Sequence, residues 1–70
     1  MTDQERAKAR HAMQVIGDHA ANMLLVMNDL NEMSLDLREY SVGLQIAGVE
    51  VELSILMRAA QERYEQLEWE

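Results

Sequence analysis

The chain has 70 residues and a formal net charge of −7, 49% of its residues are hydrophobic, and it has no proline or cysteine. This length allows one domain near the lower limit for independent folding, where oligomerisation often supplies missing core. The composition excludes disulfides and thiolate metal sites, and the acidic balance disfavours binding to nucleic acid or anionic membranes. We expect one helical, cytoplasmic domain over residues 1–70, of bacterial or phage origin.

The first predicted helix covers about residues 3–32. Thr2 and Glu5 have the spacing of a capping box, in which each side chain bonds the other's backbone N–H. Apolar residues then recur at alternating steps of four and three, as on one face of a helix. They are Ala9, Met13, Ile16, Ala20, Met23, Met27 and Leu30. The opposite side is polar apart from Leu25, which we keep as a secondary partner contact.

The turn is predicted at about residues 31–36, where Asn31, Ser34 and Asp36 compete for backbone hydrogen bonds. Asp36 and Glu39 repeat the capping spacing, so the second helix is expected over about residues 37–68. Folding here would place Met27 opposite Val42. One continuous helix is the alternative, because no proline interrupts the chain, but the polar cluster argues against it.

The charges at the two chain ends favour an antiparallel hairpin. Three basic residues lie near the first helix N-terminus and several glutamates near the second helix C-terminus, namely Arg6, Lys8, Arg10, Glu62, Glu65, Glu68 and Glu70. Each group opposes the dipole of its own helix. Folded back, the two ends lie side by side and complement each other, which selects orientation more than it adds stability.

The second predicted helix is apolar on two sides. One stripe consists of Val42, Ile46, Val49, Leu53, Leu56 and Ala60, and the other of Leu37, Tyr40, Leu44, Gly48, Val51 and Ile55. The first helix can bury only one stripe, so the second is expected to contact another molecule, with close approach at Gly48. We predict an all-α antiparallel two-helix hairpin that dimerises into a four-helix bundle-like assembly. Whether this stripe serves the dimer or a partner protein stays open.

A strand over residues 49–55, paired with residues 44–46, is the alternative to the second helix. The residues from Val49 to Ile55 alternate between apolar and polar, as in a strand with one buried face. Against this, the helical period continues to Leu67, and a lone β-hairpin has no sheet to join. We therefore retain the helix.

No constellation of residues predicts catalysis, a cofactor or a metal. His11 and His19 are eight residues apart, and neither has the helically spaced partner that zinc or di-iron sites use. We therefore expect no enzyme. Tyr64 and Trp69, which lie among glutamates, are instead predicted with Leu25 as secondary contacts to a protein.

These features favour a small acidic homodimeric adaptor that binds and inhibits another protein. The expected target is a transcription regulator or other nucleic-acid-binding protein with a basic surface. In size and shape the chain is similar to small bacterial and phage antagonists such as anti-activators. The sequence contains no motif that assigns it to one of those families. The main alternative is a chaperone that sequesters a helical partner. A subunit of an open-ended assembly is a third class, and direct contact with nucleic acid or membrane is not expected.

Overall fold

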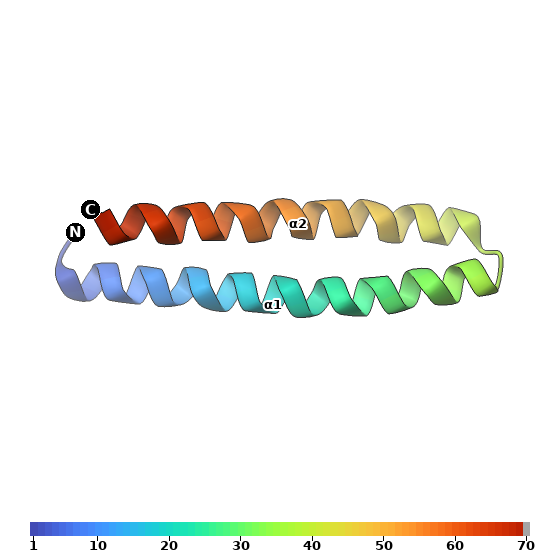
Figure 1. The fold of residues 1–70 in the computed structure, drawn as a ribbon, viewed down its shortest axis with the longest axis horizontal. Coiled ribbons are helices and arrows are strands. Elements are labelled where there is room, and N and C mark those ends of the chain that lie inside the picture. Colours follow the sequence, from blue (N-terminus) through green and yellow to red (C-terminus); the bar gives the residue numbers. More distant parts are fainter. Residues whose placement is uncertain (70) are drawn as a thin grey trace.

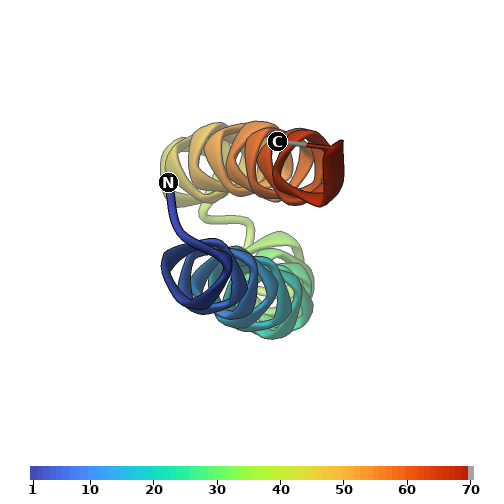
Figure 2. The same cartoon turned by 90° about the vertical axis from the view of Figure 1, so that its left-hand side faces the viewer.

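Two long antiparallel helices make up the fold (Figure 1). The computed structural model describes residues 1–69, with α1 at Asp3–Asp36 and α2 at Tyr40–Trp69. The Cα atoms extend over 52 × 14 × 11 Å. The molecule is therefore a rod one helix pair wide, with both termini at one end and both flanks of the pair open (Figure 2). The predicted all-α hairpin is confirmed.

The N-terminus of α1 forms the predicted capping box. The backbone N–H of Glu5 donates to Thr2 Oγ1 at 3.1 Å, and the N–H of Thr2 donates to Glu5 Oε1 at 3.4 Å. Both bonds satisfy backbone donors that have no partner within the helix. Asp3 adds an ion pair with Arg6 at 3.3 Å, within the same first turn.

The turn lies later in the chain than the polar cluster predicts. α1 runs through residues 31–36 and ends in a Schellman motif, in which the N–H of Glu39 donates to Ser34 O at 2.8 Å and that of Arg38 to Leu35 O at 3.1 Å. Arg38 adopts φ 58°, the left-handed conformation that glycine usually supplies. The residue at this position is neither glycine nor asparagine, so its type does not indicate where the turn lies.

The polar residues expected in the turn are helical for a local reason. Ser34 is buried between the helices, and its Oγ donates to Asn31 O at 2.8 Å, one helical turn back. Asp36 is the last residue of α1, so the cap predicted for the second helix at Asp36 does not form. The carbonyl of Glu39 instead accepts the first bond of α2, from the N–H of Gly43 at 3.0 Å.

A seven-residue repeat on both helices forms the interface between them. The buried and half-buried residues at its positions are Arg6, Arg10, Met13, Gly17, Ala20, Leu24, Met27, Asn31 and Ser34 on α1, and Gly43, Ile46, Glu50, Leu53, Met57, Ala60, Tyr64 and Leu67 on α2. Among residues 1–69, Leu53 and Leu67 are the only large apolar side chains that are buried. The core of a single hairpin is therefore thin and rich in small residues.

The position of the turn sets how the helices align. A Cβ added at Gly43 would lie 3.0 Å from Ser34 Oγ, so Gly43 faces Ser34. The expected pairing of Met27 with Val42 is therefore wrong, because a later turn shifts α2 along α1. Within residues 1–69 the tight approach occurs at Gly43, and a Cβ at Gly48 would have no neighbour within 4 Å.

Candidate interaction surfaces

The candidate site is the exposed apolar surface of the two helices. Within residues 1–69, no three His, Cys, Asp or Glu side chains gather closely enough to hold a metal ion. Many large apolar side chains are instead exposed along both helices. Two sets of them, on different sides of the hairpin, are described in turn.

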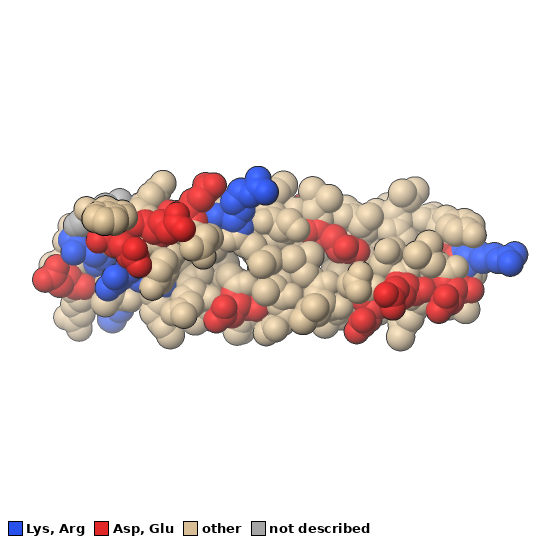
Figure 3. Space-filling view, viewed as in Figure 1, with Lys and Arg blue, Asp and Glu red and all other residues tan. Residues whose placement is uncertain are grey.

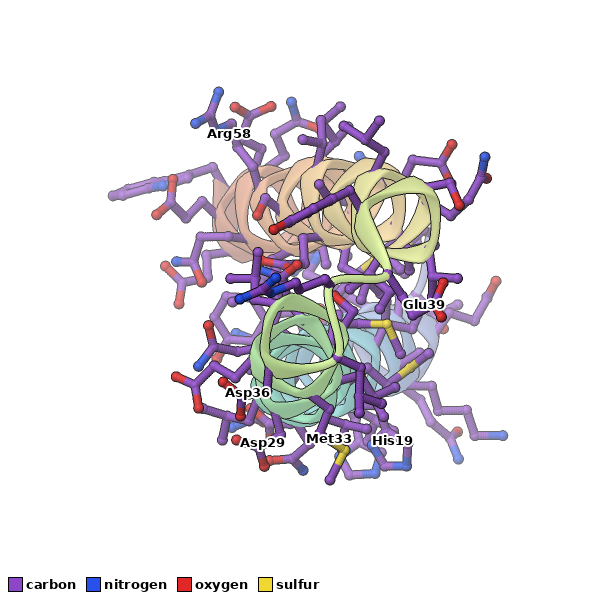
Figure 4. All side chains as sticks on the ribbon, turned by 90° about the vertical axis from the view of Figure 1, so that its right-hand side faces the viewer. His19, Asp29, Met33, Asp36, Glu39 and Arg58 are labelled. Atoms are coloured by element: carbon purple, nitrogen blue, oxygen red, sulfur yellow. The ribbon has the colours of Figure 1, made fainter. Side chains whose placement is uncertain are left out.

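The first surface, here called the shared apolar face, is built by both helices. It consists of Ile16, Met23 and Leu30 from α1 and Val42, Val49 and Leu56 from α2, which are 37–49% exposed. Leu30 and Val42 line one apolar groove at its turn end, together with Met33 and Leu37. Figure 4, which looks along the rod from the turn, places His19 and Met33 on one side of α1 and Asp36 on the other. The shared apolar face lies on the side of Met33.

The same six residues were expected inside the hairpin. The predicted stripes contain the interface residues Met13, Ala20 and Met27 on α1 and Ile46, Leu53 and Ala60 on α2, but these alternate with the six residues of the shared apolar face. Each stripe is therefore centred between the hairpin interface and the shared apolar face. A helix with two neighbours has its apolar arc centred between them. The periodicity is thus that of helices covered on two sides, and the hairpin covers only one.

The second surface is the outer stripe of α2, predicted as a dimer or partner interface. Its members Tyr40, Leu44, Val51 and Ile55 are 60–74% exposed, and Gly48 is exposed among them. They point away from α1, as expected. Leu37 does not belong with them, because it caps the C-terminus of α1 and lines the groove at the end of the shared apolar face.

A groove beside the outer stripe contains an unusual carboxylate. It is lined by Leu24, Ala47, Glu50, Val51, Ser54, Ile55 and Arg58. Glu50 occupies an interface position, and its Oε1 is buried without a hydrogen-bond partner among the described residues. A buried polar atom without a partner costs about 1–3 kcal/mol. The sequence pattern missed Glu50, because it lies between two apolar neighbours that suggested an alternating strand.

The secondary contacts predicted from sequence lie in different environments. Tyr64 is half-buried and lines a groove of about 580 Å³ together with Met13, Gly17 and Met57, so it belongs mainly to the hairpin interface. Leu25 and Trp69 are exposed, Trp69 at 88%. Of the three, only these two have most of their surface exposed.

Charge is unevenly distributed over the rod. Figure 3 shows acidic side chains along both helices, with acidic and basic side chains mixed at the end that carries the termini. Figure 4 places Arg58 and Asp36 on the side opposite Met33 and His19. The outer stripe and the Glu50 groove lie on the Arg58 side and are thus close to charged groups.

α2 is also long and apolar enough, by length and composition alone, to span a membrane. The one 18-residue window of α2 with at most two charged residues, residues 40–57, contains both Glu50 and Glu52. A charged side chain near the bilayer centre costs about 2.5–3.5 kcal/mol. These two glutamates therefore make insertion of this helix into a bilayer costly.

Comparisons of the chain with protein-family models, with curated proteins and with solved structures gave no match.

Proposed function

We propose that the chain is a small acidic homodimeric adaptor that binds another protein and blocks its activity. The observation that carries the proposal is the outer stripe, since Tyr40, Leu44, Val51 and Ile55 form an exposed apolar strip. Next to it lies the half-buried carboxylate of Glu50, whose Oε1 has no hydrogen-bond partner among the described residues. Exposed apolar strips rimmed by polar groups are typical of protein-binding surfaces.

The expected partner presents an apolar helix together with basic side chains. A helix laid along the outer stripe would bury these four side chains, as in helix-in-groove recognition. A basic group beside Glu50 would gain a charge-assisted hydrogen bond and relieve the unpaired carboxylate. With a net charge of −7, the chain also attracts basic proteins over distance. Proteins that bind nucleic acid have such surfaces, which supports an inhibitor of a transcription regulator.

The test is capture of a partner from lysate of the source cell by the tagged full chain, followed by reconstitution with the purified captured protein. We expect Val51→Glu to lower the affinity at least tenfold, because it places a charge in the apolar strip. Val15→Glu is the matched control, since Val15 is an exposed valine of α1 away from both surfaces. Equal binding by both variants would contradict the proposal.

Salt dependence separates the inhibitor from a chaperone that sequesters a helical partner. An interaction led by charge weakens as salt rises, whereas apolar capture does not. We expect binding to weaken with salt and Glu50→Gln to reduce the salt dependence. In the same assay the captured protein should lose its nucleic acid. Binding of duplex DNA or RNA by the isolated chain would contradict the proposal, and so would attachment of the chain to anionic lipid vesicles in place of a protein.

A further inference from the structure

The hairpin exposes more surface than a compact protein of its mass. Its accessible surface is 5481 Å². A compact monomer of 8.1 kDa exposes about 4,500 Å² on the usual scaling, so the excess is about 1,000 Å². A stable protein–protein interface covers roughly 800 Å² on each partner. One further interface of standard size therefore accounts for the excess.

The shared apolar face has the dimensions for such an interface. From the level of Ile16 to that of Val42, which lies near Leu35 because Gly43 faces Ser34, it extends for about 28 Å at 1.5 Å per residue. Two helices side by side are roughly 20 Å wide. The projected area is thus about 600 Å² per copy. Side chains that project from the helices increase the contact area further. All six side chains that define the face are uncharged.

The apolar residues of this face alternate between the two helices along the rod. Leu30 and Val42 line the same groove. Because Gly43 faces Ser34, Val42 lies near the level of Leu35, Val49 near that of Asn28 and Leu56 near that of Ala21, so each falls between or beside the apolar residues of α1. A second hairpin that lies in the same direction brings its α2 against this α1 and repeats this alternation across the contact.

The charges support this arrangement. When the two hairpins lie in the same direction, the basic start of α1, with Arg6, Lys8 and Arg10, lies beside the end of the second copy's α2, with Glu62, Glu65 and Glu68. Opposite charges at adjoining helix ends favour one orientation over the other. In the reverse direction a pair centred on the shared apolar face would still cover that face, but these oppositely charged helix ends would not adjoin.

We infer that a second copy of this chain covers the shared apolar face, with the two hairpins side by side in the same direction as a four-helix bundle. The outer stripe of α2 then stays open for the partner protein. This inference rests on the homodimer of the proposed function and assigns its interface.

Sedimentation equilibrium at micromolar concentration tests the interface. The wild-type chain should have twice the 8.1 kDa monomer mass. Met23→Glu and Val49→Glu should each weaken the dimer at least a hundredfold, whereas Val15→Glu and the outer-stripe variant Val51→Glu should leave the mass unchanged. A monomeric wild type would refute the homodimer. Disruption by Val51→Glu but not by Val49→Glu would refute this interface while the homodimer of the proposed function stands.

Spin labels give a second measurement that leaves both surfaces intact. The chain has no cysteine, so Ala7→Cys accepts a single label near the terminal end. Hairpins in the same direction bring the two labels within about 40 Å, given helix spacings of 8–10 Å. Opposed hairpins centred on the shared apolar face separate them by about 60 Å, given the helical rise. The longer distance, or no intermolecular distance, would overturn the arrangement.

Discussion

Arg38 is the residue that holds the strain of the turn. It adopts φ 58° to end α1, and its neighbours complete the Schellman motif around it. For a residue with a Cβ the left-handed conformation costs about 1–2 kcal/mol, which glycine largely avoids. The geometry of the turn thus results from the hydrogen bonds of Glu39 and Arg38 and not from local preference.

Arg38→Gly should therefore stabilise the protein by about 1 kcal/mol, because glycine removes the strain at the cost of some chain entropy. Chemical unfolding followed by circular dichroism at fixed concentration measures the gain. Arg38→Ala is the control, since it removes the guanidinium and keeps the Cβ. An equal gain for both variants would mean that the charge, and not the backbone, is unfavourable at this position.

At the scale of the helices, the contact between Gly43 and Ser34 sets how closely they pack at the turn end. A Cβ at Gly43 would lie 3.0 Å from Ser34 Oγ and 3.5 Å from Asn31 Oδ1. The hydroxyl of Ser34 is itself held by its bond to Asn31 O. Glycine in a helix interior costs about 1 kcal/mol relative to alanine, so the close approach has to offset that cost.

A double-mutant cycle tests this packing. Gly43→Ala should be about 1 kcal/mol more favourable in the Ser34→Ala background than in the wild type, since the second change removes the atom that a new Cβ meets. Thermal unfolding of the four proteins at one concentration gives the coupling. Gly48→Ala is the matched control, because a Cβ there has no neighbour within 4 Å among the described residues, and its effect should not depend on Ser34. Additive effects at Gly43 would show that the helices are further apart in solution.

At the scale of the whole molecule, the hairpin buries few large apolar side chains. Of those in residues 1–69, only Leu53 and Leu67 are buried. In the homodimer that we propose, association supplies the missing core, and folding is linked to protein concentration.

The midpoint of thermal unfolding should accordingly rise by roughly 3–6 °C for each tenfold increase in concentration, as mass action predicts for a folded dimer of this size. Circular dichroism at 222 nm over a concentration series measures it. A midpoint that does not move would indicate a hairpin that folds as a monomer. A spectrum without strong helical signal at any concentration would contradict the fold itself.

The sequence by itself determined that the chain forms two helices, where the first begins and that each has a heptad-like apolar arc. These properties depend on local hydrogen bonding at Thr2 and Glu5 and on side-chain spacing, which the sequence carries directly. It also determined the outer stripe of α2, because this surface faces away from α1 and does not depend on how the two helices are aligned. The pairing partner of that stripe stays a prediction.

The tertiary structure decided the position of the turn, the alignment of the helices and the division of each apolar arc between two surfaces. The turn depends on Arg38 in the left-handed conformation, which an arginine in the sequence does not indicate. Because the turn comes later than predicted, every residue of α2 is shifted along α1 relative to its expected partner. The spacing predicts that Met23 and Val49 face the hairpin interface, although that interface uses only one edge of each apolar arc. Periodicity reports the centre of an apolar arc, and only the packed helices show which neighbour lies on each side of it.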